Sequence, residues 1–85
     1  MGKYERLITV ILSGKSDLSI RFTELTGLLS SMGFDERIKG DHHIFCRQDI
    51  EEILNLQPQG SQAKGYQVRQ VRNLIIKYRL EGPNE

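Results

Sequence analysis

Two adjacent histidines, His42 and His43, are the residues best suited to proton transfer in this 85-residue chain. An imidazole titrates near neutral pH, so it can take up or release a proton during a reaction. The pair follows Gly40-Asp41, a dipeptide that favours a two-residue hairpin turn. Successive strand residues point to opposite faces, so we expect one imidazole on each face of a sheet. Two histidines in a small domain can also be purely structural, and the residue types leave both interpretations open.

The single cysteine, Cys46, lies in the same predicted strand. A metal site made of His42, His43 and Cys46 is not expected, because neighbouring strand residues diverge and no fourth ligand is evident. Cys46 is not expected to be a nucleophile either, because a cysteine in an apolar strand usually packs as a small hydrophobic residue. We therefore expect no metal and no other cofactor.

Charge is unevenly distributed along the chain, although the formal net charge is only +1. Segment 35–52 holds six acidic residues, whereas segment 53–80 holds none and has five basic ones: Lys64, Arg69, Arg72, Lys77 and Arg79. A basic region of this kind is typical of a phosphate-binding surface, and equally of a solvated helix face. Lys64 lies in a predicted loop, and Arg69 and Arg72 lie at the start of the predicted helix that follows, whose N-terminus also attracts anions.

The elements that must position these residues follow from the hydrophobic pattern and the turn signals. The pattern predicts, in order, helices over 4–12 and 21–32, strands over 36–39, 42–48 and 52–57, and a helix over 66–80. Residues 48–51 are predicted to form a second turn, and Pro58 ends the third strand because proline cannot donate to a ladder. Residues 59–65, rich in small side chains, are predicted to form a flexible loop that carries Lys64.

This order predicts an α+β domain over 1–85, with helices on one face of a three-stranded antiparallel sheet and an open second face. A chain of this size buries only about 60–65% of its unfolded surface, so a deep cofactor pocket is not expected. The longest apolar stretch, 7–12, is far shorter than the roughly 20 residues of a membrane span. We therefore expect no membrane partner. We also expect a cytoplasmic protein, because a single cysteine excludes an internal disulfide framework.

Several of these residues together resemble the HicA toxin family, also called YcfA-like. The resemblance covers about 19–80, and its most specific part is a Gly-x-His-His-Ile-Phe run after a helix that ends in Gly33-Phe34. Segments 54–58 and 66–72 look like a longer subgroup that also carries an N-terminal extension, here 1–18. Residues 81–85 are then a polar tail.

The resemblance implies a fold like the double-stranded-RNA-binding domain and the activity of an mRNA interferase from a type II toxin–antitoxin system. The family's catalytic histidine falls on His42, which would act as general base on an RNA 2′-hydroxyl or as general acid on the leaving oxygen. The implied partners are mRNA and a HicB-type antitoxin. Candidate RNA-binding residues are Lys39, Lys64, Arg69 and Arg72.

One position departs from the family pattern. Asp41 stands where the family usually has Ser or Gly, and its carboxylate could orient the His42 ring but would also repel an incoming phosphate. Two other functions therefore stay open. One is a non-catalytic RNA-binding module of the same fold, and the other is a protein-interaction domain whose basic helix binds an acidic partner.

Overall fold

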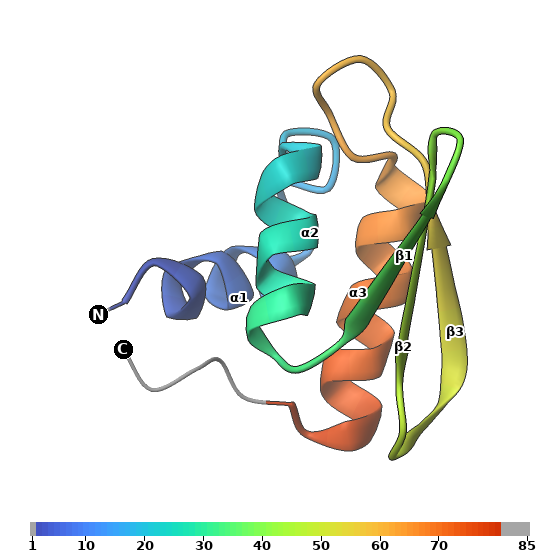
Figure 1. The fold of residues 1–85 in the computed structure, drawn as a ribbon. Helices are drawn as coiled ribbons and strands as arrows, with labels where there is room; N and C mark the ends of the chain where they lie inside the picture. Colours follow the sequence, from blue (N-terminus) through green and yellow to red (C-terminus); the bar gives the residue numbers. More distant parts are fainter. Residues whose placement is uncertain (1, 81–85) are drawn as a thin grey trace.

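The computed structural model describes residues 2–80, which form three helices and one antiparallel sheet (Figure 1). The helices are α1 (Lys3–Ser13), α2 (Phe22–Ser31) and α3 (Gly65–Tyr78), and the strands are β1 (Asp35–Lys39), β2 (His42–Arg47) and β3 (Ile50–Leu56). The predicted order of elements is confirmed. The predicted polar tail, 81–85, lies outside the described residues.

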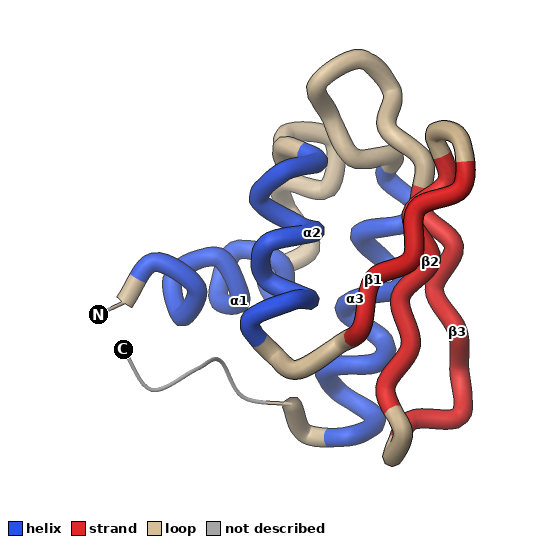
Figure 2. The backbone as a smooth tube through the Cα atoms, viewed as in Figure 1, coloured by secondary structure: helices blue, strands red, loops and turns tan. Residues whose placement is uncertain are grey.

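The sheet has the order β1-β2-β3, and the helices cover one of its faces (Figure 2). Phe45, Leu54 and Leu56 are buried on the covered face, where they join a single hydrophobic core with residues of all three helices. Ile53 and Asn55 alternate with these leucines and are exposed, because successive strand residues point to opposite faces. The predicted α+β layout with one open sheet face is therefore confirmed.

Strand β3 begins at Ile50, two residues before the predicted start at Glu52. Ile50 is buried and pairs with Arg47, so the second turn contains only residues 48–49. The register shifts between Phe45 and Arg47, and this irregularity allows the early pairing. Nε of Arg47 also lies 2.8 Å from the Asp49 carboxylate, which closes the turn.

Helix α1 is part of the core and not an independent appendage. Its Leu7 and Ile11 side chains are buried, and Ile11 is fully inaccessible to solvent. The Arg72 guanidinium on α3 donates to the backbone carbonyl of Ile11 at 3.0 Å and forms two bonds with the Asp17 carboxylate. The segment that precedes α2 is thus fastened to α3. None of the helices within residues 2–80 has the length and apolarity needed to cross a membrane.

The loop between β3 and α3 is held at several points, which corrects the prediction of a flexible loop. The backbone amide of Ala63 donates to the carbonyl of Ile20 at 2.8 Å, and the amide of Phe22 donates to the carbonyl of Ser61 at 2.9 Å. Ala63 is also buried in the core. These bonds fasten the loop to the segment at the start of α2 and give it a defined path.

Candidate active site at one end of the sheet

The two histidines lie on opposite faces of β2, as predicted from strand alternation. The His43 ring faces the helices, where it meets the Phe22 ring edge-on at a centroid distance of 4.9 Å. Its Nδ1 atom lies 2.7 Å from the Glu36 carboxylate of β1. His43 is therefore engaged in packing and a local ion pair. His42 lies on the open face directly after the Gly40-Asp41 turn, in which Gly40 takes the expected positive φ of 64°.

The His42 ring is oriented by a neighbour on β3. Its Nδ1 atom lies 3.0 Å from Oδ1 of Asn55. An amide oxygen can only accept, so Nδ1 must carry the proton in this bond. In the neutral ring Nε2 is then the unprotonated nitrogen and has a lone pair free to accept a proton. The His42 side chain is 47% exposed, so this nitrogen is open to a ligand from solvent.

Asp41 adds a negative charge at the same place. One of its carboxylate oxygens lies 3.9 Å from Nε2 of His42, and the other accepts a hydrogen bond from Nε2 of Gln57 at 2.6 Å. The bond from Gln57 lowers the pKa of the Asp41 carboxyl, and the nearby charges of His42 and Lys64 lower it further. Asp41 is consequently an anion at neutral pH, at the mouth of the candidate site.

A buried glutamine fixes the backbone around these groups. Gln67 on α3 is fully buried, and its Nε2 donates to the Gln57 carbonyl at 3.1 Å. Its Oε1 accepts from the backbone amide of Lys64 at 3.2 Å. Both ends of segment 57–64 are therefore tied to one side chain. Gln57 and Lys64, which both act on Asp41, are positioned by the same helix.

His42 lines a shallow pocket of about 520 Å³ with Lys39, Gly40, Asp41, Ile44 and Asn55. Lys39 is the direct strand partner of His42 across the β1–β2 hairpin. Lys64 is close enough to attract the Asp41 carboxylate. Two of the four predicted RNA-binding residues, Lys39 and Lys64, are thus gathered at the His42 end of the sheet.

The other two predicted RNA-binding residues lie elsewhere. Arg72 is bound to Asp17, with N–O distances of 2.9 and 3.1 Å, and only 17% of its side chain is exposed. We assign Arg72 a structural role for this reason. Arg69 is exposed on α3, and within residues 2–80 no hydrogen bond or ion pair links it to the His42 pocket. Lys77 is also paired, with Glu52 at 2.8 Å, so the basic side of α3 is smaller than its sequence indicates.

Cys46 lies on the same sheet face as His42, but it is exposed and not packed as expected. No helix within residues 2–80 lies over the open face (Figure 1), and the Cys46 thiol is accessible there. His42 and His43 cannot share one ion, because they point to opposite faces. Among residues 2–80 no three His, Cys, Asp or Glu side chains are placed to hold a metal.

Three residues of the site were not predicted from the sequence: Asn55, Gln57 and Gln67. Asn55 alternates with the buried Leu54 and Leu56, so strand periodicity alone places it on the face of His42. Gln67 falls on the buried stripe of α3, four positions before Val71, and is the one polar side chain among the buried residues of this helix. No sequence signal pointed to Gln57.

Comparison with known proteins finds no family model that matches the chain, and no curated protein or solved structure that matches it.

Proposed function

We propose that this protein is an RNA endonuclease of the mRNA interferase type, with His42 as its acid–base catalyst. One observation carries the proposal: Asn55 holds Nδ1 of His42 at 3.0 Å and leaves Nε2 free in an open pocket. The resemblance of the Gly-x-His-His-Ile-Phe run to HicA toxins supports the same residue. The α2-β1-β2-β3-α3 arrangement also suits a fold like the double-stranded-RNA-binding domain.

The proposed reaction uses the RNA's own 2′-hydroxyl as nucleophile. Nε2 of His42 accepts the hydroxyl proton while the 2′-oxygen forms a bond to the adjacent phosphorus. The bond from phosphorus to the 5′-oxygen of the next nucleotide breaks, which leaves a 2′,3′-cyclic phosphate and a 5′-hydroxyl. The departing oxygen takes its proton from water, because one imidazole cannot act as base and acid at once.

The charges around His42 act in opposite directions on this reaction. Lys39 and Lys64 bring positive charge to the pocket and can stabilise the phosphate as negative charge develops on it. Asp41 opposes the approach of the phosphate, although it favours the protonated ring once the proton has moved. General base catalysis contributes about 10²- to 10⁴-fold, so we propose a modest nuclease.

The open site of His42 also suits an RNA substrate and a protein partner. We propose mRNA as the substrate and a HicB-type antitoxin as the partner, acting in the cytoplasm. The pocket of His42 is shallow and lies on the sheet face that the three helices of the described residues leave open. A protein partner could cover such a site without any rearrangement of the core.

The test compares the purified wild type with His42→Ala on a short single-stranded RNA labelled at its 5′ end, in the presence of a chelator. We expect the wild type to release products with 2′,3′-cyclic phosphate ends. His42→Ala is expected to lose cleavage by at least about 10²-fold while its RNA affinity changes little. Cleavage that survives in His42→Ala, or that stops with the chelator, would contradict the proposed mechanism.

A second candidate function is a non-catalytic RNA-binding module. The Asp41 carboxylate favours it, because this group lies 3.9 Å from the nitrogen that must receive the proton. In that case the wild type and His42→Ala bind RNA equally and neither cleaves it. The same experiment therefore separates the two candidates.

A further inference from the structure

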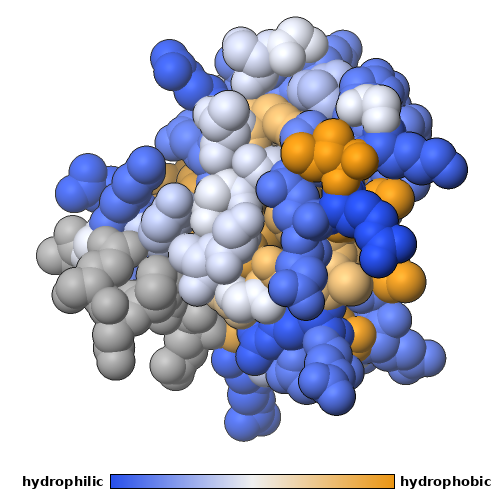
Figure 3. All heavy atoms as spheres, viewed as in Figure 1, coloured by the Kyte–Doolittle hydropathy of each residue, from blue (hydrophilic) through white to orange (hydrophobic). Residues whose placement is uncertain are grey.

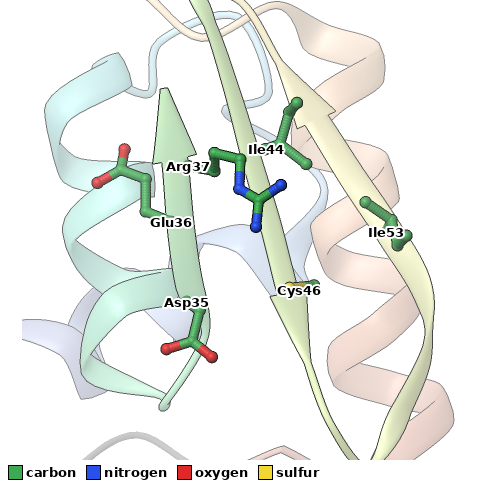
Figure 4. Close-up of a pocket in the computed structure, with 6 residues that line it drawn as sticks. All are labelled: Asp35, Glu36, Arg37, Ile44, Cys46 and Ile53. Atoms are coloured by element: carbon green, nitrogen blue, oxygen red, sulfur yellow. The ribbon is translucent and has the colours of Figure 1, made fainter. Parts of the chain in front are cut away.

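The open face of the sheet carries a second pocket beside that of His42. It has a volume of about 430 Å³ and shares Ile44 with the His42 pocket. Its lining comes from all three strands: Asp35, Glu36, Arg37, Ile44, Cys46 and Ile53 (Figure 4). Glu36 binds His43 on the other face, and none of these six side chains has a part in the proposed proton transfer.

The floor of this pocket is apolar and open to solvent. Ile44 is half-buried, and Ile53 is 66% exposed, although large aliphatic side chains usually avoid water. Cys46 lies between the outer strands on the same face (Figure 4). Hydrophobic side chains also show on the sheet side of the molecular surface, among hydrophilic ones (Figure 3). A flat apolar ligand can lie against this floor.

Two charged side chains border the floor. Arg37 extends from β1 across the face toward β2, and Asp35 lies two residues earlier on the same strand (Figure 4). Within residues 2–80 neither side chain makes a hydrogen bond or an ion pair. The pocket thus offers a ligand the planar N–H donors of the Arg37 guanidinium and the two acceptor oxygens of the Asp35 carboxylate.

We infer that this pocket binds an unpaired guanine base of the RNA whose phosphate lies at His42. Proteins read single-stranded RNA by stacking splayed bases on flat side chains, arginine included, and by hydrogen bonds to base edges. Arginine pairs with O6 and N7 of guanine, and a carboxylate accepts from N1–H and the 2-amino group. Of the four bases, guanine alone has two acceptors on one edge and two adjacent donors on another.

The spacing of the two pockets fits neighbouring nucleotides. The pair Lys39–His42 and the pair Arg37–Ile44 are successive same-face pairs of the β1–β2 ladder. Such pairs are about 7 Å apart, which is close to the length of one nucleotide in an extended strand. This inference rests on the proposed function, since it takes the ligand at His42 to be RNA.

The test measures RNA binding in the His42→Ala background, so that it does not depend on cleavage. The probes are short single-stranded RNAs that differ at one position, which holds guanosine, inosine, 7-deazaguanosine or adenosine. Inosine lacks the 2-amino group, and 7-deazaguanosine lacks N7. We expect guanosine to be preferred over adenosine by about 5- to 150-fold. Asp35→Ala should lose the preference over inosine, and Arg37→Ala should lose the preference over 7-deazaguanosine.

Arg6→Ala is the matched control. Arg6 is exposed on α1, which lies on the far side of the helices from the sheet, and it carries the same charge as Arg37. Its removal should affect all four RNAs equally. Circular dichroism of each variant shows whether the fold is kept.

The outcomes separate this inference from the proposed function. If the wild type binds guanosine selectively but does not cleave RNA, the guanine-binding inference is supported and the proposed catalytic function is contradicted. If RNA is cleaved and neither Asp35→Ala nor Arg37→Ala changes base preference, the proposed catalytic function stands and the guanine-binding inference is contradicted. An equal loss of affinity for all four RNAs on Arg37→Ala also overturns it. Absence of RNA binding, with a protein partner that protects this face, overturns it in favour of a protein-docking surface.

Discussion

The Nδ1 atom of His42 donates a hydrogen bond to Oδ1 of Asn55, which lies diagonally across the β2–β3 ladder. Asn55 is directly opposite Ile44, and the distance between the two polar atoms is 3.0 Å. Diagonal pairs on one sheet face are within reach of long side chains. The bond fixes both the tautomer and the direction of the His42 ring, so the role that we propose for Nε2 depends on Asn55.

Replacing Asn55 should therefore lower cleavage without a matching loss of RNA affinity. We expect Asn55→Ala to reduce kcat by about 10- to 100-fold, because small misplacements of a catalytic group cost this much. Asn55→Asp keeps an acceptor and should recover part of the rate. Its carboxylate favours the imidazolium, so the acidic limb of its pH–rate profile, where the rate rises as the ring loses its proton, should lie at higher pH than that of wild type. If both variants keep wild-type kcat, Asn55 has no positioning role.

Removing the Asp41 carboxylate should help RNA to enter the site. This anion lies 3.9 Å from Nε2 of His42, and in the proposed reaction the phosphate lies next to the 2′-hydroxyl that this nitrogen contacts. We expect Asp41→Ser to bind RNA several-fold more tightly, with a difference that shrinks as salt increases. Asp49→Ser is the control, because it removes an equal charge at the turn on the opposite end of β2. Titrations at two salt concentrations check this, and equal gains for both variants would show a general charge effect only.

The docking of α1 gives a prediction about stability. Ile11 is fully buried, whereas its neighbour Leu12 is 45% exposed. Ile11→Ala should lower the free energy of unfolding by about 2–5 kcal/mol, which is the usual cost of such a cavity. Leu12→Ala should lower it by less than about 1 kcal/mol, because surface substitutions are usually mild. Urea denaturation of both variants measures the difference. Equal and small effects would mean that α1 contributes little to the core.

Acid should weaken one contact between β3 and α3. Lys77 and Tyr78 donate hydrogen bonds to the Glu52 carboxylate and lower its pKa from 4.5 to about 2. As pH falls, the Glu52 carboxylate is therefore protonated in the unfolded chain before it is protonated in the folded chain. The contribution of Glu52 to stability is complete above pH 4.5 and is lost as pH falls toward about 2.

The variant Glu52→Gln checks this contribution. Its Tm should lie below that of wild type above pH 4.5, and the gap should narrow toward pH 2. Glu51→Gln is the control, since the Glu51 carboxylate has no ion-pair partner among residues 2–80. Its Tm should follow that of wild type across the range. A gap for Glu52→Gln that does not change with pH would show that the carboxylate charge is not involved.

Local patterns were enough to predict the order of the elements and the placement of His42 and His43 on opposite faces of the sheet. Strand alternation separates His42 from His43, and the turn chemistry of Gly40 places them at the start of β2. Both signals come from neighbouring residues. The register shift after Phe45 is not encoded locally, because it depends on the burial of Ile50, and the start of β3 was therefore predicted two residues late.

Partners that are distant in the sequence could not be predicted. Arg72 was assigned to RNA because its charge is visible in the sequence, whereas its partner Asp17 precedes it by 55 residues. Asn55 lies 13 residues from His42, and their contact depends on the register of two strands. A charge pattern therefore indicates which residues are basic, but the fold decides which of them are already neutralised.

The buried Gln67 makes one backbone amide a reporter of the site. The amide of Lys64 is bonded to the Gln67 side chain, and that side chain also holds the Gln57 carbonyl. Exchange of this amide hydrogen with solvent requires that the side-chain bond opens. Its exchange rate, followed by NMR in the absence of any RNA, therefore measures how often the support behind Asp41 and His42 comes apart.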